Sequence, residues 1–560
     1  VSGGMGPLIG RAAHDASVHL QAAGKISSEA LRQQNNIPSL AKLAEHMQGS
    51  AAYQLKLALQ GGGMDVDLSS NLQGMALRLP APFDKPAASS LALRLQSRGL
   101  AVQNGKRTHD QIQMDWGPQF SLLYQRDLLA ASPRVQRGLI QWGAAKNPAA
   151  LPAEGVQANI TLDTFYLDAW QNLLSEVWAS TPALQNANTQ SYLPNKARIE
   201  VGTLTAQGRT LHQVQTQIAH QGNAWTSQLE SLEASGTLDY KIADDGRPGR
   251  LTARLKRLDL GQAQTAELED ALIAQPANIP SLDIVIDAFT LRGKELGRVE
   301  MDASNHGGTN DANREWRLNK LKISNPESRL NAVGVWLAGS PTKTTVLNVK
   351  WDIDDSGKLL ARLGTPHVLA KGKGKIEGQV SWQGSPLSVH YPSMNGKLQL
   401  DMHDGRFLQA DPGIAKLLGV LNLQALPRRL ALDFRDVFSQ GFAYDFVRGD
   451  IDLRQGVAST NNLQMKGLNA AVLMEGFADV KDETQDLHVV VIPEINAGTA
   501  SLIATAINPA IGIGTFLAQM ILRKPLGKAA TQEFRITGSW LDPKVEKLTR
   551  KSPAANSSAP

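Results

Sequence analysis

The stretch "YQLKLALQ", residues 53–60, is the clearest guide to the fold of this chain. Tyr53, Leu55, Leu57 and Leu59 occupy every second position, and Gln54, Lys56 and Gln60 lie at positions between and after them. Successive side chains of a β-strand point to opposite faces, so a period of two predicts a strand with one apolar and one hydrated face.

The same alternation recurs along the chain. It appears in "LALRLQ" (91–96), "IQMDW" (112–116), "TVLNVKWDI" (345–353) and "KLQLDMHDG" (397–405). Gly, Asn and Asp punctuate these runs, as hairpin turns require, so the sequence predicts a mainly β, mostly antiparallel protein. The apolar positions that we single out are Leu55, Leu57, Leu93, Met114, Leu347, Val349, Trp351, Leu398, Leu400 and Met402.

Helical periodicity is rare. It appears in "SLAKLAEHM" (39–47), in "LDAWQNLLSEVW" (167–178), with Asp168 as the expected N-cap, and in "DPGIAKLLGVL" (411–421). These short helices are expected to cap the sheet.

Two segments resemble each other. "LTAQGRTLHQVQTQI" (204–218) and "FTLRGKELGRVEMDA" (289–303) each alternate, contain a Gly followed by a basic residue, and alternate again. This pattern predicts two hairpins of an array built by adding like modules.

The composition excludes several classes of protein. The 560 residues are 42% hydrophobic with a mean hydropathy of -0.23, which is unlike a polytopic membrane protein. A net charge of +5 argues against nucleic-acid binding, and the absence of cysteine excludes disulfides and thiolate metal sites. The start, "VSGGMGPLIG", carries no signal-peptide pattern and no N-terminal span, so we expect a fragment or a processed product.

No catalytic pattern emerges from the residues. Metalloprotease, serine-hydrolase and P-loop motifs are absent. "GKGKIEG" (372–378) is interpreted as a hairpin turn leading into a strand, and Asp433 and Asp436 in "LDFRD" as charges on a hydrated strand face. The sequence therefore predicts no enzyme, no cofactor and no metal site.

The apolar strand faces outnumber the helices that could cover them. Two sheets could cover each other as sandwiches. Alternatively, one long curved sheet could leave its inner face to a non-protein occupant such as acyl chains, because an uncovered stripe of that size would aggregate.

Residues 495–522 carry no charge. Three interpretations of this segment are possible: a transmembrane helix, a buried core hairpin, or a hairpin that dips into one leaflet. Pro509 splits the segment into halves too short to span a bilayer, which disfavours the transmembrane helix. We expect the membrane-touching hairpin, over 495–527. Its predicted contacts are Leu502, Ile503, Ile507, Ile511, Ile513, Phe516, Leu517, Met520, Ile521, Arg523, Lys524 and Lys528.

Several blocks resemble the bacterial AsmA-like family, in particular its YhdP branch. They are "LPRRLALDFRDVFSQGFAYDFVRGDIDLRQGVASTNNLQMKG" (426–467), "VIPEINAG" (491–498), "FRITGSWLDPKVEKL" (534–548) and "SSNLQGMALRLPAPFDKPA" (69–87). "LPAEGVQANITLDTFYLDAWQNLL" (151–174) and "AVGVWLAG" (332–339) also fit, and the blocks follow the family's order.

The resemblance implies a repeating β-groove with an apolar inner face, a periplasmic location and an inner-membrane anchor outside this portion. It implies a conduit that carries phospholipids between the inner and outer membranes and supports the outer-membrane barrier, with the C-terminal end at the outer membrane. An envelope-tethering β protein and an envelope hydrolase are the alternatives.

The expected organisation follows from these observations. Residues 1–179 and 196–400 are expected to form groove repeats, separated by a linker or loop at 180–195. Residues 401–550 form the AsmA-like C-terminal region, and 551–560 a disordered tail.

Overall fold

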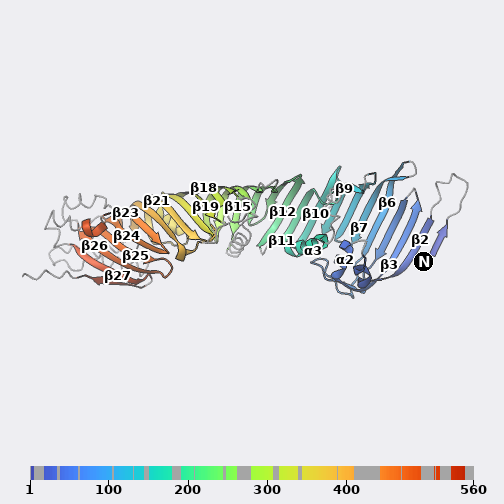
Figure 1. Ribbon diagram of the computed structural model, residues 1–560, viewed down its shortest axis with the longest axis horizontal. Helices are drawn as coiled ribbons and strands as arrows, with labels where there is room; N and C mark the ends of the chain where they lie inside the picture. Colours follow the sequence, from blue (N-terminus) through green and yellow to red (C-terminus); the bar gives the residue numbers. More distant parts are fainter. Residues whose placement is uncertain are drawn as a thin grey trace, which may run out of the picture. The chain divides into compact units, whose positions relative to one another are not determined.

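The computed structural model describes most of the chain. The described residues are 2–5, 18–34, 38–60, 63–103, 106–129, 132–143, 150–179, 191–206, 209–243, 248–261, 279–306, 315–337, 343–386, 389–408, 442–467, 470–493, 510, 512–516, 531–540 and 542–548. The chain divides into two compact units, Val1–Lys241 (unit 1) and Ile242–Pro560 (unit 2), and both are mainly β (Figure 1).

Among its described residues, unit 1 contains strands β1 to β14 and three short helices. Its strands are β1 (Ser2–Met5), β2 (Val18–Ser27), β3 (Met47–Gln60), β4 (Gly63–Ser70), β5 (Met75–Leu77), β6 (Leu93–Gln103), β7 (Lys106–Trp116), β8 (Phe120–Asp127), β9 (Arg134–Gly143), β10 (Gly155–Tyr166), β11 (Lys196–Ala206), β12 (Arg209–Gln221), β13 (Ala224–Glu230) and β14 (Ala234–Lys241). Its helices are α1 (Ser28–Arg32), α2 (Pro38–Glu45) and α3 (Leu167–Ala179).

Unit 2 contains strands β15 to β28 and the helix α6 (Ser356–Arg362), with a 3-10 turn η4 (Tyr391–Ser393). Its strands are β15 (Arg250–Leu260), β16 (Ser281–Leu291), β17 (Lys294–His306), β18 (Glu315–Asn325), β19 (Ser328–Leu337), β20 (Thr344–Ile353), β21 (Leu369–Gln383), β22 (Asn395–Phe407), β23 (Phe442–Arg454), β24 (Val457–Gly467), β25 (Ala470–Asp479), β26 (Thr484–Pro493), β27 (Gln532–Ser539) and β28 (Pro543–Lys547).

The prediction of a mainly β, mostly antiparallel fold is confirmed, with a correction. Most neighbouring strands pair antiparallel, but β9–β10, β10–β11 and β15–β16 pair parallel, so the sheet is mixed. A parallel pair needs a crossover rather than a tight turn. Residues 144–154, 167–195 and 261–280 connect these three pairs, and the predicted linker at 180–195 lies in the second connection.

The predicted repeat corresponds to two hairpins, β11–β12 and β16–β17. The turn of the second hairpin contains Arg292 and Gly293, with φ of 52° and 76°. Positive φ at both central residues matches the twist of the flanking strands, and Gly adopts it without strain. The first strand of each hairpin also pairs in parallel with the strand that precedes it in the chain, as β10–β11 or β15–β16. The two modules therefore share their topology as well as their sequence pattern.

Two of the three predicted helices are confirmed, as α2 and α3, whereas residues 411–421 lie outside the described part of the chain. Asp168 lies within the first turn of α3 and not at its N-cap, since the helix begins at Leu167. The turn expected at "GKGKIEG" is also wrong. Lys371 and Gly372 have positive φ, but β21 continues through them.

The C-terminal apolar helical hairpin is not among the described elements. Of residues 495–527, the structure describes 510 and 512–516, of which 512–516 are helical. In the parts of the chain that are described, no helix is both long and apolar enough to cross a membrane.

Candidate functional site

One apolar row crosses the strands of unit 1 in register. Residues directly opposite each other on neighbouring strands point to the same face of a sheet, so the strand pairing identifies the members of the row. In order from β2 to β12 they are Ala22, Leu55, Leu68, Leu95, Met114, Leu122, Ile140, Ala158, Ala197 and Ile218. We call the surface that carries this row the apolar face of unit 1.

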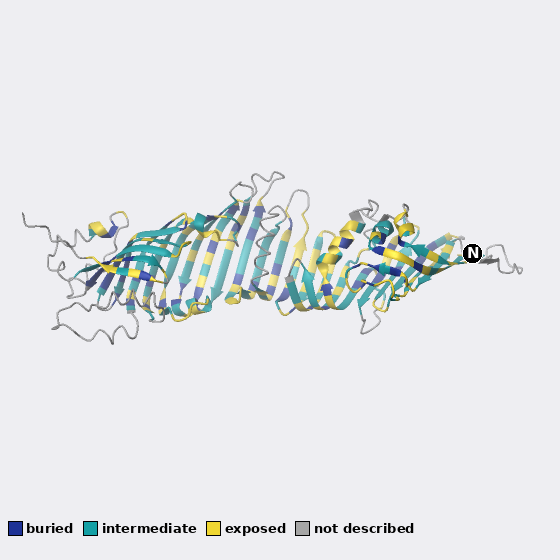
Figure 2. Cartoon of the chain, turned by 90° about the horizontal axis from the view of Figure 1, so that it is seen from below, coloured by how far each residue is buried: buried dark blue, intermediate teal, exposed yellow. Residues whose placement is uncertain are grey.

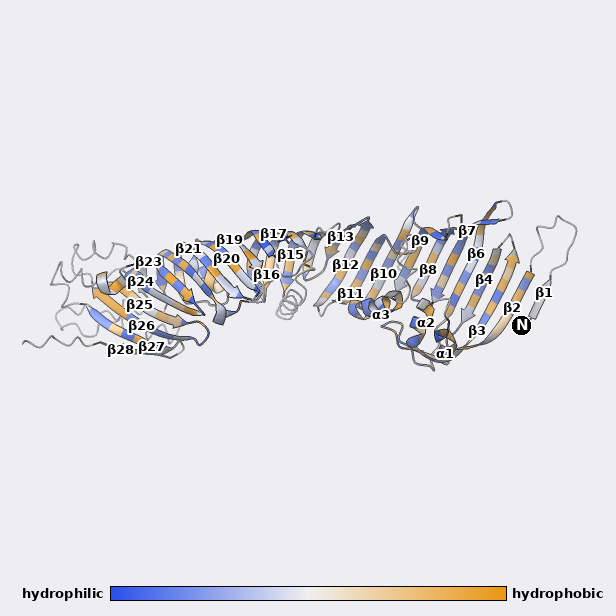
Figure 3. Cartoon of the chain, viewed as in Figure 1, coloured by the Kyte–Doolittle hydropathy of each residue, from blue (hydrophilic) through white to orange (hydrophobic). Residues whose placement is uncertain are grey.

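Most of this row is half-buried; Ala158 alone among its members is buried. The opposite face of β2–β7 carries a polar row of Gln21, Lys56, Asp67, Gln96 and Gln113. The resulting stripes are visible along the strands (Figure 3). The sheet of unit 1 therefore separates a hydrated surface from an apolar surface that protein atoms cover only in part.

One end of the apolar face of unit 1 is covered by protein. Phe83, 4% exposed, lies 4.6 Å from Trp116, 5.7 Å from Trp142 and 5.9 Å from Trp170, measured between ring centroids. Leu173 of α3 and side chains of α1 and α2 join the same cluster. We call this end of the strands the closed end.

A charged pair lies on the apolar face at the opposite end of β7 and β8. Arg126 donates through Nε and Nη2 to the two carboxylate oxygens of Asp110, at 2.9 and 2.6 Å, and through Nη1 to the hydroxyl of Tyr192 at 3.2 Å. Asp110 is only 5% exposed. The Tyr124 hydroxyl donates to the Tyr192 carbonyl at 2.8 Å, and burial raises the pKa of Tyr124. The segment 191–195 is thus tied onto this face.

The apolar face of unit 2 carries three rows in register. The first consists of Leu255, Ile286, Val299, Ile323, Leu330, Trp351, Ile376 and Leu400; the second of Ala253, Ile284, Met301, Leu321, Ala332, Val349, Gly378, Leu398 and Ile451; the third of Leu251, Leu282, Ala303, Leu318, Gly334, Leu347, Val380, Gly396 and Leu453. Buried and half-buried positions alternate with exposed ones along the strands (Figure 2).

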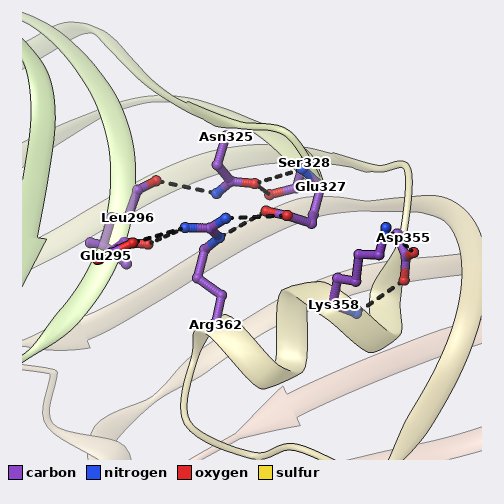
Figure 4. Close-up of polar contacts among 8 residues, drawn as sticks. All are labelled: Glu295, Leu296, Asn325, Glu327, Ser328, Asp355, Lys358 and Arg362. Atoms are coloured by element: carbon purple, nitrogen blue, oxygen red, sulfur yellow. Dashed lines mark hydrogen bonds and ion pairs between the residues drawn. The ribbon is translucent and has the colours of Figure 1, made fainter.

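Helix α6 is fastened at one edge of the apolar face of unit 2. Asp355 caps its N-terminus, accepting from the Lys358 N–H at 3.0 Å. Arg362 donates through Nε and Nη2 to Glu327 at 2.8 and 3.2 Å (Figure 4). These bonds lower the pKa of Glu327, which is 9% exposed. Leu359, at 4% exposure, packs into the apolar cluster of β20–β28.

Tryptophans occupy the other edge of this face. Trp316 and Trp336 are cross-strand partners, 8% and 2% exposed, and Thr345 connects Trp336 to Trp382 in the same row. The Trp382 indole donates to the Ser385 carbonyl at 3.0 Å. This edge is therefore packed like a protein core, in contrast to the half-buried rows beside it.

Charged side chains gather on the hydrated face of unit 2. Lys320 Nζ lies 2.6 Å from Glu300 Oε2, and Arg298 Nε lies 3.2 Å from Glu300 Oε1. Both contacts lower the pKa of Glu300, Lys320 more than Arg298. Because the two cations are largely exposed, these pairs keep the face hydrated and add little stability.

All ten apolar positions singled out from the sequence lie on the apolar face of their unit. Leu55, Leu57, Leu93 and Met114 belong to unit 1 and the other six to unit 2. Sequence reasoning missed their neighbours on β8, β9 and β16–β18, such as Leu122, Ile140 and Met301. On β8, β9 and β16 the period of two is weakened by Leu123, Leu139 and Val285 at the intervening positions, whereas Met301 lies in an alternating segment that was assigned to the repeat.

Of the twelve predicted membrane contacts, the structure describes Ile513 and Phe516; the other ten lie outside the described residues. Ile513 is fully buried against Ala471, Leu473, Val490 and Ile492, and Phe516 packs beside it. These partners lie on the surface of β25–β26 opposite to Val472 and Val491, so this strand pair is apolar on both faces. For Ile513 this placement favours the buried-hairpin alternative.

Other kinds of site find little support among the described residues. They contain no group of three or more His, Asp or Glu that could hold a metal ion. Two hollows, one between Lys196, Gln217 and Asp239 and one between Gln21, Lys56 and Asp67, are lined mostly by residues of the polar face of unit 1. Ala197 and Ile218 also line the first, and Leu57 the second. Asp433 and Asp436 are outside the described part of the chain.

Comparison with known proteins gives a consistent result. The profile of the YhdP protein family matches residues 8–545. A curated protein of Escherichia coli (strain K12), described as "Intermembrane phospholipid transporter YhdP", is 24% identical over 544 residues, which cover 90% of this chain and 39% of that protein. The chain thus spans well under half the length of this relative. No solved structure matches the chain.

Proposed function

This chain belongs to the YhdP protein family, and on that premise we propose that it forms part of a conduit that carries phospholipids between two membranes. The apolar face of each unit would line a trough for acyl chains, and the polar face would meet water. The proposal includes no catalytic step and no cofactor.

The observation that carries the proposal is the register of the apolar rows. One row crosses strands β2 to β12, and three rows cross β15 to β22. Since adjacent strands lie about 4.8 Å apart, such rows offer a nearly continuous apolar path across the strands. Their residues are mostly half-buried, so an acyl chain could still bind where protein atoms leave room.

The energetics explain why such a path would matter. Moving a phospholipid through water exposes two acyl chains, at about 0.8 kcal/mol per CH₂ and a total on the order of 20 kcal/mol. A trough that keeps these chains in apolar contact removes most of this barrier. The lipid would then move along its gradient or under the action of a partner.

The cellular setting extends beyond this chain. We propose that the longer protein is anchored in the inner membrane by a preceding segment, crosses the periplasm and meets the outer membrane near its C-terminal end. Transport would supply the outer membrane and support its permeability barrier. The relative's description as an intermembrane phospholipid transporter supports this setting.

The apolar segment 495–527 is proposed to contact the target membrane. Ile513 is buried against β25 and β26. Insertion of the segment into the membrane would therefore depend on the other predicted contact residues. Ile507→Asp combined with Met520→Asp is expected to abolish co-flotation of the chain with phospholipid vesicles and to leave the circular dichroism of the sheet unchanged. Unchanged flotation would discard the segment as a membrane contact.

The direct test of the conduit is the lipid content of the protein. Purified chain, washed free of detergent micelles, is expected to release phospholipids that mass spectrometry identifies. A folded chain without bound phospholipid, and unable to take it up from vesicles, would refute the conduit and favour an envelope tether.

A further inference from the structure

The two ends of the apolar face of unit 1 differ in exposure. The closed end is filled by the Phe83 cluster and the helices. At the opposite ends of β3, β4 and β12–β14, large side chains stay in contact with water: Leu59 is 44% exposed, Met64 47%, Trp225 38% and Tyr240 37%. We call this second end the open rim.

An aromatic ladder forms one part of the open rim. His220, Trp225 and Tyr240 are cross-strand partners on β12, β13 and β14, and they lie on the face that carries Ile218. The His220 and Trp225 rings stack with centroids 4.2 Å apart and an interplanar angle of 28°. The ladder therefore stands where the apolar face of unit 1 meets water.

Aromatic side chains of this kind suit an interface between apolar and hydrated surroundings. Trp and Tyr have apolar rings with one polar group, and in membrane proteins they gather at the level of the lipid headgroups. Their ring faces also attract quaternary and primary ammonium groups. The headgroups of the zwitterionic phospholipids carry such an ammonium group.

The length of the apolar face along β12 is sufficient for the acyl chains of a lipid whose headgroup contacts this ladder. Along β12, the distance from His220 to Val214 is about 20 Å at the rise of an antiparallel strand. One leaflet contributes about half of the ~30 Å hydrocarbon core of a bilayer, so acyl chains reach about 15 Å. Chains that start at the ladder would therefore end near Thr216, about 14 Å along β12. This point lies before Val214, which is buried with Phe165 and Val201.

We propose that a zwitterionic phospholipid lies in unit 1 with its headgroup at the open rim, against Trp225 and Tyr240, and with its acyl chains directed toward the closed end. This inference rests on the proposed function and adds to it the orientation of the lipid and the residues that meet its headgroup.

The reverse orientation lacks a place for the headgroup. Lys85, a cation at the closed end, is 5% exposed, and its ammonium donates to the carbonyls of Met75 and Pro86 at 2.8 and 3.0 Å. It is therefore occupied by backbone acceptors. The rings of the Phe83 cluster fill the remaining space at that end.

Depth-dependent quenching can test the orientation, and the absence of cysteine makes the labelling specific. Two single-cysteine variants of the full chain are labelled with a fluorophore: Asn223→Cys, in the exposed β12–β13 turn beside the ladder, and Thr216→Cys, further along β12. Each is loaded with phosphatidylcholine that carries a nitroxide either on the choline headgroup or near the acyl terminus.

The proposal predicts opposite preferences at the two sites. The headgroup nitroxide should quench the label at 223 about threefold more than the label at 216, and the acyl-terminal nitroxide should do the reverse, because His220, next to the turn, and Thr216 are about 14 Å apart along the strand. Equal quenching, or the reverse pattern, overturns the orientation but leaves the conduit intact. No quenching of either label by either lipid overturns the conduit as well.

A second variant tests the ladder itself. Trp225→Leu with Tyr240→Leu keeps the positions apolar but removes the aromatic faces, and we expect about threefold weaker retention of phosphatidylcholine. Leu59→Ala with Met64→Ala, at the same rim, is the matched control and should weaken retention of phosphatidylcholine and of diacylglycerol equally. If the ladder variant also weakens both lipids equally, the headgroup contact is refuted.

Discussion

Two carboxylates placed on the apolar face of unit 2 should block the passage of lipid without unfolding the sheet. Leu400 and Val349 are half-buried members of two neighbouring rows. Leu400 pairs with Gly449 on one side and Val349 with Gly378, so the two side chains supply most of the apolar surface at their positions. Leu400→Asp combined with Val349→Asp replaces this surface by charge.

The magnitude follows from the contacts that are lost. If each substitution removes contact with one to two CH₂ groups of a passing chain, at about 0.8 kcal/mol each, the two together raise the local barrier by about 2–3 kcal/mol. This corresponds to a slowing of about 30–150-fold. The desolvation of the carboxylates would add to this figure.

The assay uses the full-length gene that carries the double substitution. Cells are expected to lose the outer-membrane barrier, measured as sensitivity to a large antibiotic, and the purified chain to lose its bound phospholipid. Asn348→Asp with Gln399→Asp is the matched control, because it adds the same charges one residue away on the exposed, hydrated face. A double variant that folds, retains its lipid and keeps the barrier would refute the reasoning.

Three further predictions concern stability. Asp110→Ala leaves the Arg126 guanidinium without its carboxylate and should lower the free energy of unfolding of unit 1 by about 3–5 kcal/mol, measured in urea. Adding Arg126→Met should recover most of this stability, because no unpaired charge then remains. Failure of this rescue would contradict the ion-pair argument. Glu327→Gln should lower the melting temperature at neutral pH. Arg362 lowers the pKa of Glu327 from its ordinary value of 4.5, so the contribution of this pair is present above that value and is lost as the pH falls through the lowered pKa. The gap between native and variant melting temperatures should therefore close in acid, and a gap independent of pH would count against the pair. Trp336→Ala, at a position 2% exposed, should lower the free energy of unfolding by about 3–5 kcal/mol. A decrease below about 1 kcal/mol would show that the side chains at the tryptophan edge of unit 2 can repack.

Local patterns in the sequence were enough to predict the class of the fold and much of the candidate site. The alternation in "KLQLDMHDG" places Leu398, Leu400 and Met402 on one face whatever the strand pairs with, because the side-chain period of a strand is intrinsic to its backbone. The two hairpins of the repeat were also predictable, since a turn residue such as Gly293 determines the hairpin turn through its own backbone conformation and that of its neighbours.

Only the tertiary structure decided how these strands combine. The parallel pairs β9–β10, β10–β11 and β15–β16 depend on where long connections return, which no local period encodes. The rows arise from register between strands, so Leu122 and Ile140 join them although Leu123 and Leu139 weaken the alternation of their own strands. The difference between the closed end and the open rim of unit 1 arises from tertiary packing. Phe83 and Trp225 are both aromatic, but in the folded chain Phe83 is 4% exposed and Trp225 is 38% exposed. Sequence alternation thus determines which side chains share a face, whereas long-range contacts determine which part of that face remains accessible.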